Sequence, residues 1–258
     1  MSLIHPTAVI SPEASLDSSV RVGPYSVIEA GVEIGADTEI RSHCFIRGKT
    51  TIGERNRIFQ FASIGDDPQD KKYAGEDTQL VMGNGNTIRE YCNFNRGTAQ
   101  DTGVTKIGDN NWFMANVHLA HDCEVGNETI FANCATLGGH VLVDDYAILG
   151  GFVAVHQYCR VGAHAFIGVN SCITRDVPPY VMAAGHTAVP RGINAEGLKR
   201  RGFDGRQLRN IKEAYRCLYR SGLSLDEARA KIEALTDEQP ELEIFAAFLK
   251  SSERRFIR

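Results

Sequence analysis

The residues best suited to acid–base chemistry lie together in segment 116–122, which reads NVHLAHD. A neutral imidazole is the usual general base near neutral pH, so His118 and His121 are candidates for removing a proton. A carboxylate beside an imidazole can orient the ring and stabilise its protonated form, which is the part that Asp122 would take. The alternative is a set of polar turn residues without chemistry. The choice between the two depends on the elements that position these side chains.

A six-residue repeat of large apolar side chains governs most of the chain. Its positions are Ile4, Ile10, Leu16, Val22, Ile28, Ile34, Ile40, Ile46, Ile52, Ile58 and Ile64, then Met82, Ile88 and Phe94, then Ile107, Phe113, Leu119, Val125, Phe131, Leu137, Val143, Leu149, Val155, Val161, Ile167 and Ile173. A period of six does not fit an α-helix; it is typical of a solenoid in which each unit forms a short strand and a turn. Glycine often follows the repeat position and asparagine recurs four residues after it. Both residue types tolerate the positive φ that we expect at corners.

This repeat resembles that of the hexapeptide-repeat acyltransferases. The resemblance implies a mainly β fold, a left-handed parallel β-helix of triangular section with 18 residues per coil. Residues 18 apart then lie above one another, so we expect His121, Gly139 and Gln157 to stack and Asp122 to lie beside His140. Gly139 would bring a backbone N–H close to His121, as an oxyanion hole requires.

Two polar segments interrupt the repeat, at 66–79 and 96–104. Long polar loops on a rigid scaffold commonly carry function, although tolerated insertions are the plainer interpretation. The predicted organisation is a β-helix over 1–190 that carries these two loops, followed by a small α-helical domain over 191–258.

Helix-start signals and charge mark the C-terminal domain. Asp204 is a plausible N-cap, Ser224 begins a capping box, and Pro240 suits the first turn of a last helix. Segment 199–220 holds eight Lys and Arg residues against two acidic ones. This segment is either a solvated helix face or a docking site for an acidic partner or a phosphate group.

Composition excludes several classes of protein. With 258 residues, 23% charged residues and a formal net charge of −4, the chain is neither disordered nor a generally basic nucleic-acid binder. No apolar run is long enough to span a membrane, and the first residues lack the pattern of a secretory signal. The seven cysteines are odd in number and none form a C-x-x-C pair, which favours free thiols in a reducing compartment. We expect a cytoplasmic protein.

Zinc is a rival use of the histidines, because the hexapeptide class includes carbonic anhydrases with three His ligands. Ligands from stacked coils of one chain would tend to differ by 18 or 36 residues, and no two of the eight histidines do. We therefore expect no metal, with a site between chains left open. A zinc-dependent hydratase and a non-catalytic sugar-nucleotide scaffold remain the alternatives to catalysis by acyl transfer.

Six segments, in order along the chain, resemble motifs of one family within this class, the UDP-N-acetylglucosamine O-acyltransferases. They are FQFASIGDDPQDKKYAGE, VHLAHDCEVGN, LGGHVLVDD, VHQYC, DVPPYV and NAEGLKRRGF. The resemblance implies transfer of an (R)-3-hydroxyacyl chain from acyl carrier protein to the 3-hydroxyl of UDP-N-acetylglucosamine, the first step of lipid A biosynthesis. It implies no cofactor beyond the carrier protein's phosphopantetheine arm, which holds the donor. It also implies a homotrimer with sites between adjacent β-helices.

The same resemblance assigns roles to individual residues. The general base falls on His121, supported by Asp122, the oxyanion donor on the Gly139 N–H, and the basic loop residue on Lys72. The other pocket residues that it implies are Gln69, Asp70, His118, His140, His156 and Gln157, and those near the nucleotide, which reach a neighbouring subunit's site, are Asn194, Glu196, Arg200 and Arg201.

Two departures and one length-setting position concern the substrates. Asn95 stands where the family usually has histidine, and Gly185-His186-Thr187 stands where it usually has Gly-Asn. These departures leave a 3-hydroxyl or a 3-amino acceptor open. Val169 matches the position that limits the acyl groove, which predicts donors of about 10–12 carbons. The alternative is that Val169 is a packing residue, two positions after the inward Ile167.

Overall fold

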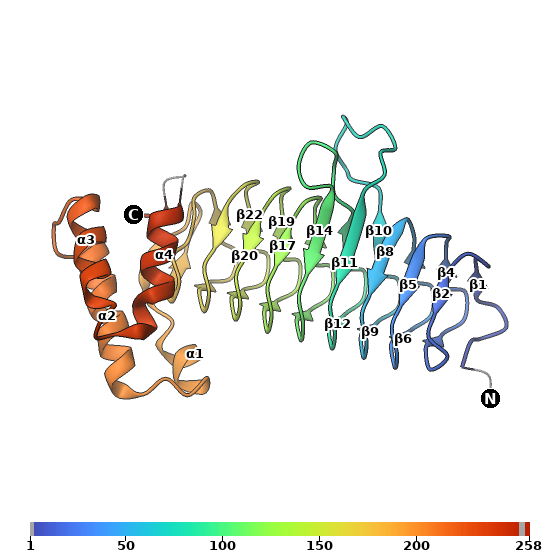
Figure 1. Ribbon diagram of the computed structural model, residues 1–258, viewed down its shortest axis with the longest axis horizontal. Helices are drawn as coiled ribbons and strands as arrows, with labels where there is room; N and C mark the ends of the chain where they lie inside the picture. Colours follow the sequence, from blue (N-terminus) through green and yellow to red (C-terminus); the bar gives the residue numbers. More distant parts are fainter. Residues whose placement is uncertain (1–2, 253–255) are drawn as a thin grey trace.

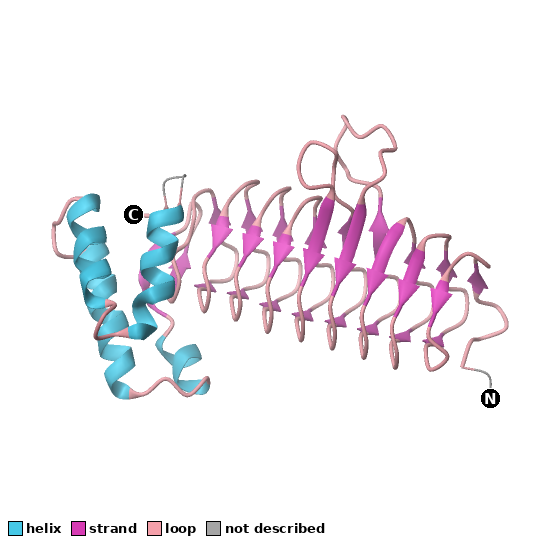
Figure 2. Ribbon diagram, viewed as in Figure 1, coloured by secondary structure: helices cyan, strands magenta, loops and turns pink. Residues whose placement is uncertain are grey.

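The computed structural model describes residues 3–252 and 256–258 as a long prism of β-strands with helices packed at its C-terminal end (Figure 1). Three sheets run along the prism (Figure 2), and each successive strand lies in the next sheet except for the last two, which share one sheet and run antiparallel to each other. Three consecutive strands therefore form one coil. This arrangement confirms the predicted left-handed parallel β-helix with a helical C-terminal region.

Over residues 3–252 and 256–258, the three sheets contain nine, eight and ten strands. The first sheet contains β1 (Val9–Ile10), β4 (Val27–Ile28), β7 (Phe45–Ile46), β10 (Ser63–Asp66), β13 (Asn93–Asn95), β16 (His118–Leu119), β19 (Thr136–Leu137), β22 (Ala154–Val155) and β25 (Cys172–Ile173). The second contains β2 (Ser15–Leu16), β5 (Val32–Ile34), β8 (Lys49–Ile52), β11 (Gln79–Met82), β14 (Val104–Ile107), β17 (Glu124–Val125), β20 (Leu142–Val143) and β23 (Arg160–Val161). The third contains β3 (Arg21–Val22), β6 (Glu39–Ile40), β9 (Arg57–Ile58), β12 (Thr87–Ile88), β15 (Trp112–Phe113), β18 (Ile130–Phe131), β21 (Ile148–Leu149), β24 (Phe166–Ile167), β26 (Val181–Ala184) and β27 (Val189–Ile193).

The repeat side chains form the interior of the prism. Ile64 pairs with Phe94, and Phe94 pairs with Leu119, so both polar loops leave the inward positions aligned. The Phe94 and Phe113 rings meet inside the prism with centroids 5.0 Å apart. At the N-terminal end, however, Ile4 is 38% exposed, because among the described residues it lies in the outermost coil. The repeat therefore specifies an inward direction, and burial also requires a neighbouring coil.

The glycines after the repeat positions serve a different purpose from the one predicted. Apart from Gly65, they do not have positive φ. A Cβ on Gly35 would lie 2.9 Å from the carbonyl carbon of Gly53, so glycine is needed because successive coils approach closely. The repeated asparagines are also not the positive-φ residues. Their buried amides bond along the axis, with Asn86 Nδ2 donating to Asn56 Oδ1 at 3.1 Å.

The positive φ at the corners is held by larger residues. One corner carries a ladder of stacked rings, with centroids 5.1–5.2 Å apart, formed by Tyr25, His43, Phe61 and Tyr91. Left-handed backbone is unfavourable for bulky side chains, and stacking between coils offsets part of that cost.

Helices close the C-terminal end of the prism. They are α1 (Ala195–Arg200), α2 (Gly205–Tyr219), α3 (Leu225–Leu235), a 3₁₀ turn (Pro240–Leu242) and α4 (Glu243–Ser251). Both predicted caps are confirmed, since Asp204 and Ser224 each form a capping box. Pro240 begins the separate 3₁₀ turn that leads into α4. Among the described residues, no helix combines the length and apolar character needed to cross a membrane.

Candidate active site

The centre of the site is a hydrogen-bonded pair in the turn after β16. His121 Nδ1 lies 2.9 Å from Asp122 Oδ2, with the two side chains 13% and 0% exposed. Thr98 donates twice to this carboxylate, from its backbone N at 2.8 Å and its hydroxyl at 2.6 Å. Burial alone would raise the pKa of Asp122, but the bonds from His121 and Thr98 outweigh it and lower that pKa. An ionised carboxylate only accepts, so Nδ1 carries a proton, and in the neutral ring the lone pair is then on Nε2.

Gly139 lies against the His121 ring on the next coil. A Cβ at this position would be 2.5 Å from His121 Cε1 and 2.8 Å from Nε2, which leaves room for glycine alone. The coils are joined here by a hydrogen bond of 3.0 Å from His140 N to His121 O. The 18-residue register therefore brings the Gly139 backbone to the His121 ring, as the spacing predicts.

His140 lies beside Asp122, as the 18-residue spacing predicts, but its shorter contact is with a residue of the loop at 96–104. His140 Nδ1 is 3.9 Å from Asp122 Oδ2 and only 2.6 Å from Asp101 Oδ2. The ring stacks on Tyr158 with centroids 4.3 Å apart. Asp101 and Thr98 were missed as site residues by the sequence. The feature that could have identified them is that both lie in the polar loop at 96–104.

His118 faces outward from β16 and connects the site to the loop at 66–79. Its Nδ1 is 2.8 Å from Asn93 Oδ1, which also accepts from Gln69 Nε2 at 3.3 Å. Burial lowers the pKa of His118, and the neighbouring His121 lowers it further. The lowered pKa favours the neutral form of His118 at pH 7. Gln69 lies close to His118 because both side chains contact Asn93 Oδ1.

The remaining predicted loop and coil residues lie further out. Asp70, which is half-buried, accepts a hydrogen bond of 3.0 Å from the backbone N of the exposed Lys72 and thereby shapes a turn. His156 is exposed, and its Nδ1 lies 3.0 Å from Gln157 O. Gln157 lies beside the coil of Gly139, since a Cβ on Gly138 would be 2.9 Å from Gln157 N, and it is therefore two coils from His121.

The predicted nucleotide residues lie at a different corner of the chain. Asn194 caps α1 by accepting from Gly197 N at 3.2 Å, and it donates to His164 O at 3.0 Å. Arg201 lies over Tyr146, with Cζ 4.9 Å from the ring centroid. Two more of them are at the surface, where Glu196 pairs with a neighbouring lysine and Arg200 is exposed. Within the described part of one chain, no contact joins this group to His121.

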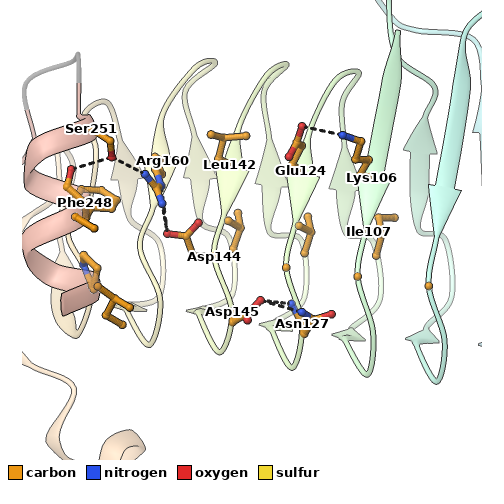
Figure 3. Close-up of a pocket in the computed structure, with 18 of the residues that line it drawn as sticks. Lys106, Ile107, Glu124, Asn127, Leu142, Asp144, Asp145, Arg160, Phe248 and Ser251 are labelled. Atoms are coloured by element: carbon orange, nitrogen blue, oxygen red, sulfur yellow. Dashed lines mark hydrogen bonds and ion pairs between the residues drawn. The ribbon is translucent and has the colours of Figure 1, made fainter. Parts of the chain in front are cut away.

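Two grooves follow the second sheet. One of about 640 Å³ reaches Asp122, His140 and Tyr158. The other, of about 920 Å³, lies between this sheet and α4 (Figure 3), where Arg160 bonds Asp144 at 2.9 Å and Ser251 at 3.1 Å. The larger groove is lined by two ion pairs, by the Asp145 carboxylate, which accepts from Asn127, and by apolar side chains. Of the two grooves, only the smaller is lined by Asp122, the hydrogen-bond partner of His121, and it is therefore the candidate substrate groove.

Three potential metal ligands meet at the same place. His121, Asp122 and His140 present ligand atoms within 4.8 Å of one another. The two histidines are 19 residues apart, so the rule based on spacings of 18 or 36 overlooked them. The expectation of no metal remains a prediction, and the spacing argument no longer supports it.

Known proteins resemble this chain along its whole length. The family model described as UDP-N-acetylglucosamine O-acyltransferase, domain 2, matches residues 176–257, and the bacterial transferase hexapeptide model matches 13–48 and 105–139. Relatives named acyl-[acyl-carrier-protein]–UDP-N-acetylglucosamine O-acyltransferase include those of Thiobacillus denitrificans, 55% identical, and Janthinobacterium sp. (strain Marseille), 54% identical, each covering 100% of both chains. The structure of the Francisella novicida UDP-N-acetylglucosamine acyltransferase is 46% identical, with a TM-score of 0.97 over 99% of this chain and 94% of that one. The chain therefore belongs to the UDP-N-acetylglucosamine O-acyltransferase family.

Proposed function

We propose that this acyltransferase moves an (R)-3-hydroxyacyl chain from acyl carrier protein to the 3-hydroxyl of UDP-N-acetylglucosamine, the step that begins lipid A biosynthesis. The names of the full-length relatives support the donor and acceptor classes. The observation that carries the mechanism is the Gly139 backbone lying against a histidine whose Nδ1 is bonded to a buried carboxylate. The pair has the geometry of a general base and its orienting acid.

The proposed step balances without a metal or cofactor. His121 Nε2 removes the proton from the sugar hydroxyl as its oxygen attacks the thioester carbon. The Gly139 N–H stabilises the oxyanion of the tetrahedral intermediate. Collapse breaks the C–S bond, and the imidazolium returns the proton to the departing thiolate of the phosphopantetheine arm. Asp122 keeps the ring oriented and stabilises its charged state throughout.

A two-substrate assay tests the proposal. The purified protein should convert UDP-N-acetylglucosamine and a 3-hydroxyacyl carrier protein into the 3-O-acyl sugar nucleotide, observed by mass spectrometry. A 3-amino analogue in parallel shows whether nitrogen is also accepted. Absence of product with both acceptors would favour the scaffold or hydratase alternatives.

We further propose that the working enzyme is a homotrimer with its sites between adjacent chains. Asn194 and Arg201 lie at another corner from His121, so a neighbouring chain has to supply them. Exposed apolar side chains support assembly, since Phe152 is 64% and Tyr91 57% exposed in the single chain. Sedimentation should give three times the mass of the 28.3 kDa chain, and a monomer with full activity would contradict this assembly.

Carrier-protein docking should depend on a cationic cluster in the helical domain. Arg209, Lys212 and Arg216 of α2 and Lys231 of α3 surround a cavity of about 540 Å³, with Glu213 beside them. Long-range attraction to an acidic carrier is screened over ~8–10 Å, so its KM should rise with salt more than the nucleotide KM does. Lys212→Glu should raise the carrier KM about threefold to tenfold. Lys250→Glu, which makes the same charge change at an 82% exposed side chain on α4, should have a smaller effect. Equal salt effects on both substrates would contradict docking at this cluster.

Acyl length should depend on Val169. Val169 is 70% exposed in the single chain, which argues against a role in core packing. A valine at the end of a groove leaves less room than glycine, so the enzyme should prefer about 10–12 carbons and Val169→Gly should favour longer donors. Val9→Gly, at a residue 62% exposed near the other end of the prism, is the matched control. Competition between donors of 10 to 16 carbons measures the preference, and an unchanged preference in Val169→Gly would contradict the assignment.

A further inference from the structure

Arg96 lies between the two polar loops that interrupt the prism. Its side chain is 8% exposed, so protein groups have to satisfy the buried guanidinium. Nη1 donates to Gly65 O, and Nη2 donates to Asp67 Oδ1. Nη2 also donates to the Tyr73 hydroxyl at 2.9 Å. The planar guanidinium therefore holds the first loop near its beginning and again at Tyr73.

Tyr73 belongs to the turn that carries two predicted site residues. Its backbone N donates to Asp70 O at 3.0 Å, and Lys72 N donates to the Asp70 carboxylate at 3.0 Å. The Tyr73 hydroxyl in turn donates to Glu76 O at 3.1 Å. Because Arg96 bonds this hydroxyl, it fixes the place from which Asp70 and Lys72 project.

The residues after Arg96 reach the catalytic pair. Gly97 has no space for a side chain, since a Cβ there would clash with the Gly103 backbone. Thr98 makes its two hydrogen bonds to Asp122, and Asp101 bonds His140. Segment 96–101 is therefore held by the first loop at one end and by the site at the other.

We propose that Arg96 is a positioning residue that joins the two loops into one unit. Through Tyr73 it places the turn of Asp70 and Lys72, and through Thr98 it sets the carboxylate that orients His121. The structural part of this inference stands on the contacts alone. Its catalytic consequence rests on the proposed function.

Hydrogen exchange of the purified, assembled enzyme tests the structural part without any substrate. In Arg96→Met, peptides covering 67–78 and 96–103 should exchange about tenfold faster or more, while peptides from the other coils stay protected. Arg96→Lys should recover only part of the protection, because the single ammonium nitrogen of lysine cannot reach all three acceptors that the two guanidinium nitrogens contact.

Arg47 offers a matched control. Like Arg96 it contacts the Asp67 carboxylate, at 3.7 Å, and it also contacts Asp66 at 3.1 Å, but neither of these ion pairs involves the Tyr73 turn. Arg47→Met should exchange like the wild type across 70–73 and 96–103. Unchanged loop exchange in Arg96→Met, full protection in Arg96→Lys, or an equal loss in Arg47→Met would overturn the proposal.

Kinetics with both substrates test the catalytic consequence. Arg96→Met should lower kcat and raise the nucleotide KM together, since both loops move. Tyr73→Phe removes only one hydroxyl, so it tests the same contact even if Arg96→Met does not fold. This variant should raise the nucleotide KM about threefold and leave kcat near that of the wild type. A Tyr73→Phe enzyme with wild-type kinetics and wild-type loop exchange would overturn the proposal. An inactive wild-type enzyme with the expected exchange pattern would instead refute the proposed function and leave the loop unit intact.

Discussion

Replacing His121 with alanine should lower kcat by about 10²–10⁴-fold, the usual contribution of a positioned general base. The imidazole is the group whose Nε2 faces the reacting hydroxyl in the proposed step, and its Nδ1 is fixed at 2.9 Å from Asp122. Removing the ring also leaves the buried carboxylate with its two bonds from Thr98, so the loop stays anchored. The melting temperature should therefore change little.

His43→Ala is the matched control for this variant. His43 is likewise a histidine at a corner of the prism, but it stacks between Tyr25 and Phe61, away from His121 and Asp122. Its loss should leave kcat within about twofold, as for an ordinary surface substitution. Near-normal turnover by a folded His121→Ala enzyme would show that another group takes the proton.

Replacing Gly139 with alanine should lower kcat by about 10²–10³-fold, comparable to the loss of one oxyanion donor. The new methyl group would lie 2.5 Å from His121 Cε1, well inside van der Waals contact. Either the imidazole turns away from Asp122 or the backbone moves, and both movements separate the N–H from the reacting carbonyl. Substrate KM values should change much less than kcat.

Gly151→Ala separates this local effect from a general effect on the coil. Gly151 also precedes a corner residue with positive φ, Phe152, but the nearest atom to its added Cβ is Asn133 O at 3.4 Å. Circular dichroism and thermal melting should show both variants folded, with only Gly139→Ala losing activity. An active Gly139→Ala enzyme, or equal losses in both, would contradict the proposed oxyanion site.

The repeat predicted the coil correctly because it reports one geometric fact, namely which side chain points inward. Loops leave at a corner and return to the same inward position, as the pairing of Ile64, Phe94 and Leu119 shows. Helix caps were equally readable, since the Asp204 and Ser224 boxes involve residues three positions apart. Short α1 was not anticipated, because its cap, Asn194, is held by a long-range bond to His164 O.

Corner conformation was misjudged for a related reason. Glycine and asparagine were expected at positive φ from their intrinsic preferences, whereas Tyr25 and His43 hold it in the structure. Stacking between successive coils stabilises those rings, and this contact cannot be predicted from the residues of one coil alone. The glycines instead satisfy the close approach of backbones, as Gly35 and Gly53 do.

By itself, the sequence determined the prism, the register that brings Gly139 to His121, and the adjacent Asp122. Each of these follows from a fixed spacing along the chain. The tertiary structure alone decided that Thr98 holds Asp122, that Asp101 bonds His140, and that Arg96 binds the other loop at Tyr73. These partners are 24, 39 and 23 residues apart, and at least one member of each pair lies in a loop outside the repeat. Loop conformation is set by long-range contacts that have no period, so no sequence spacing encodes it.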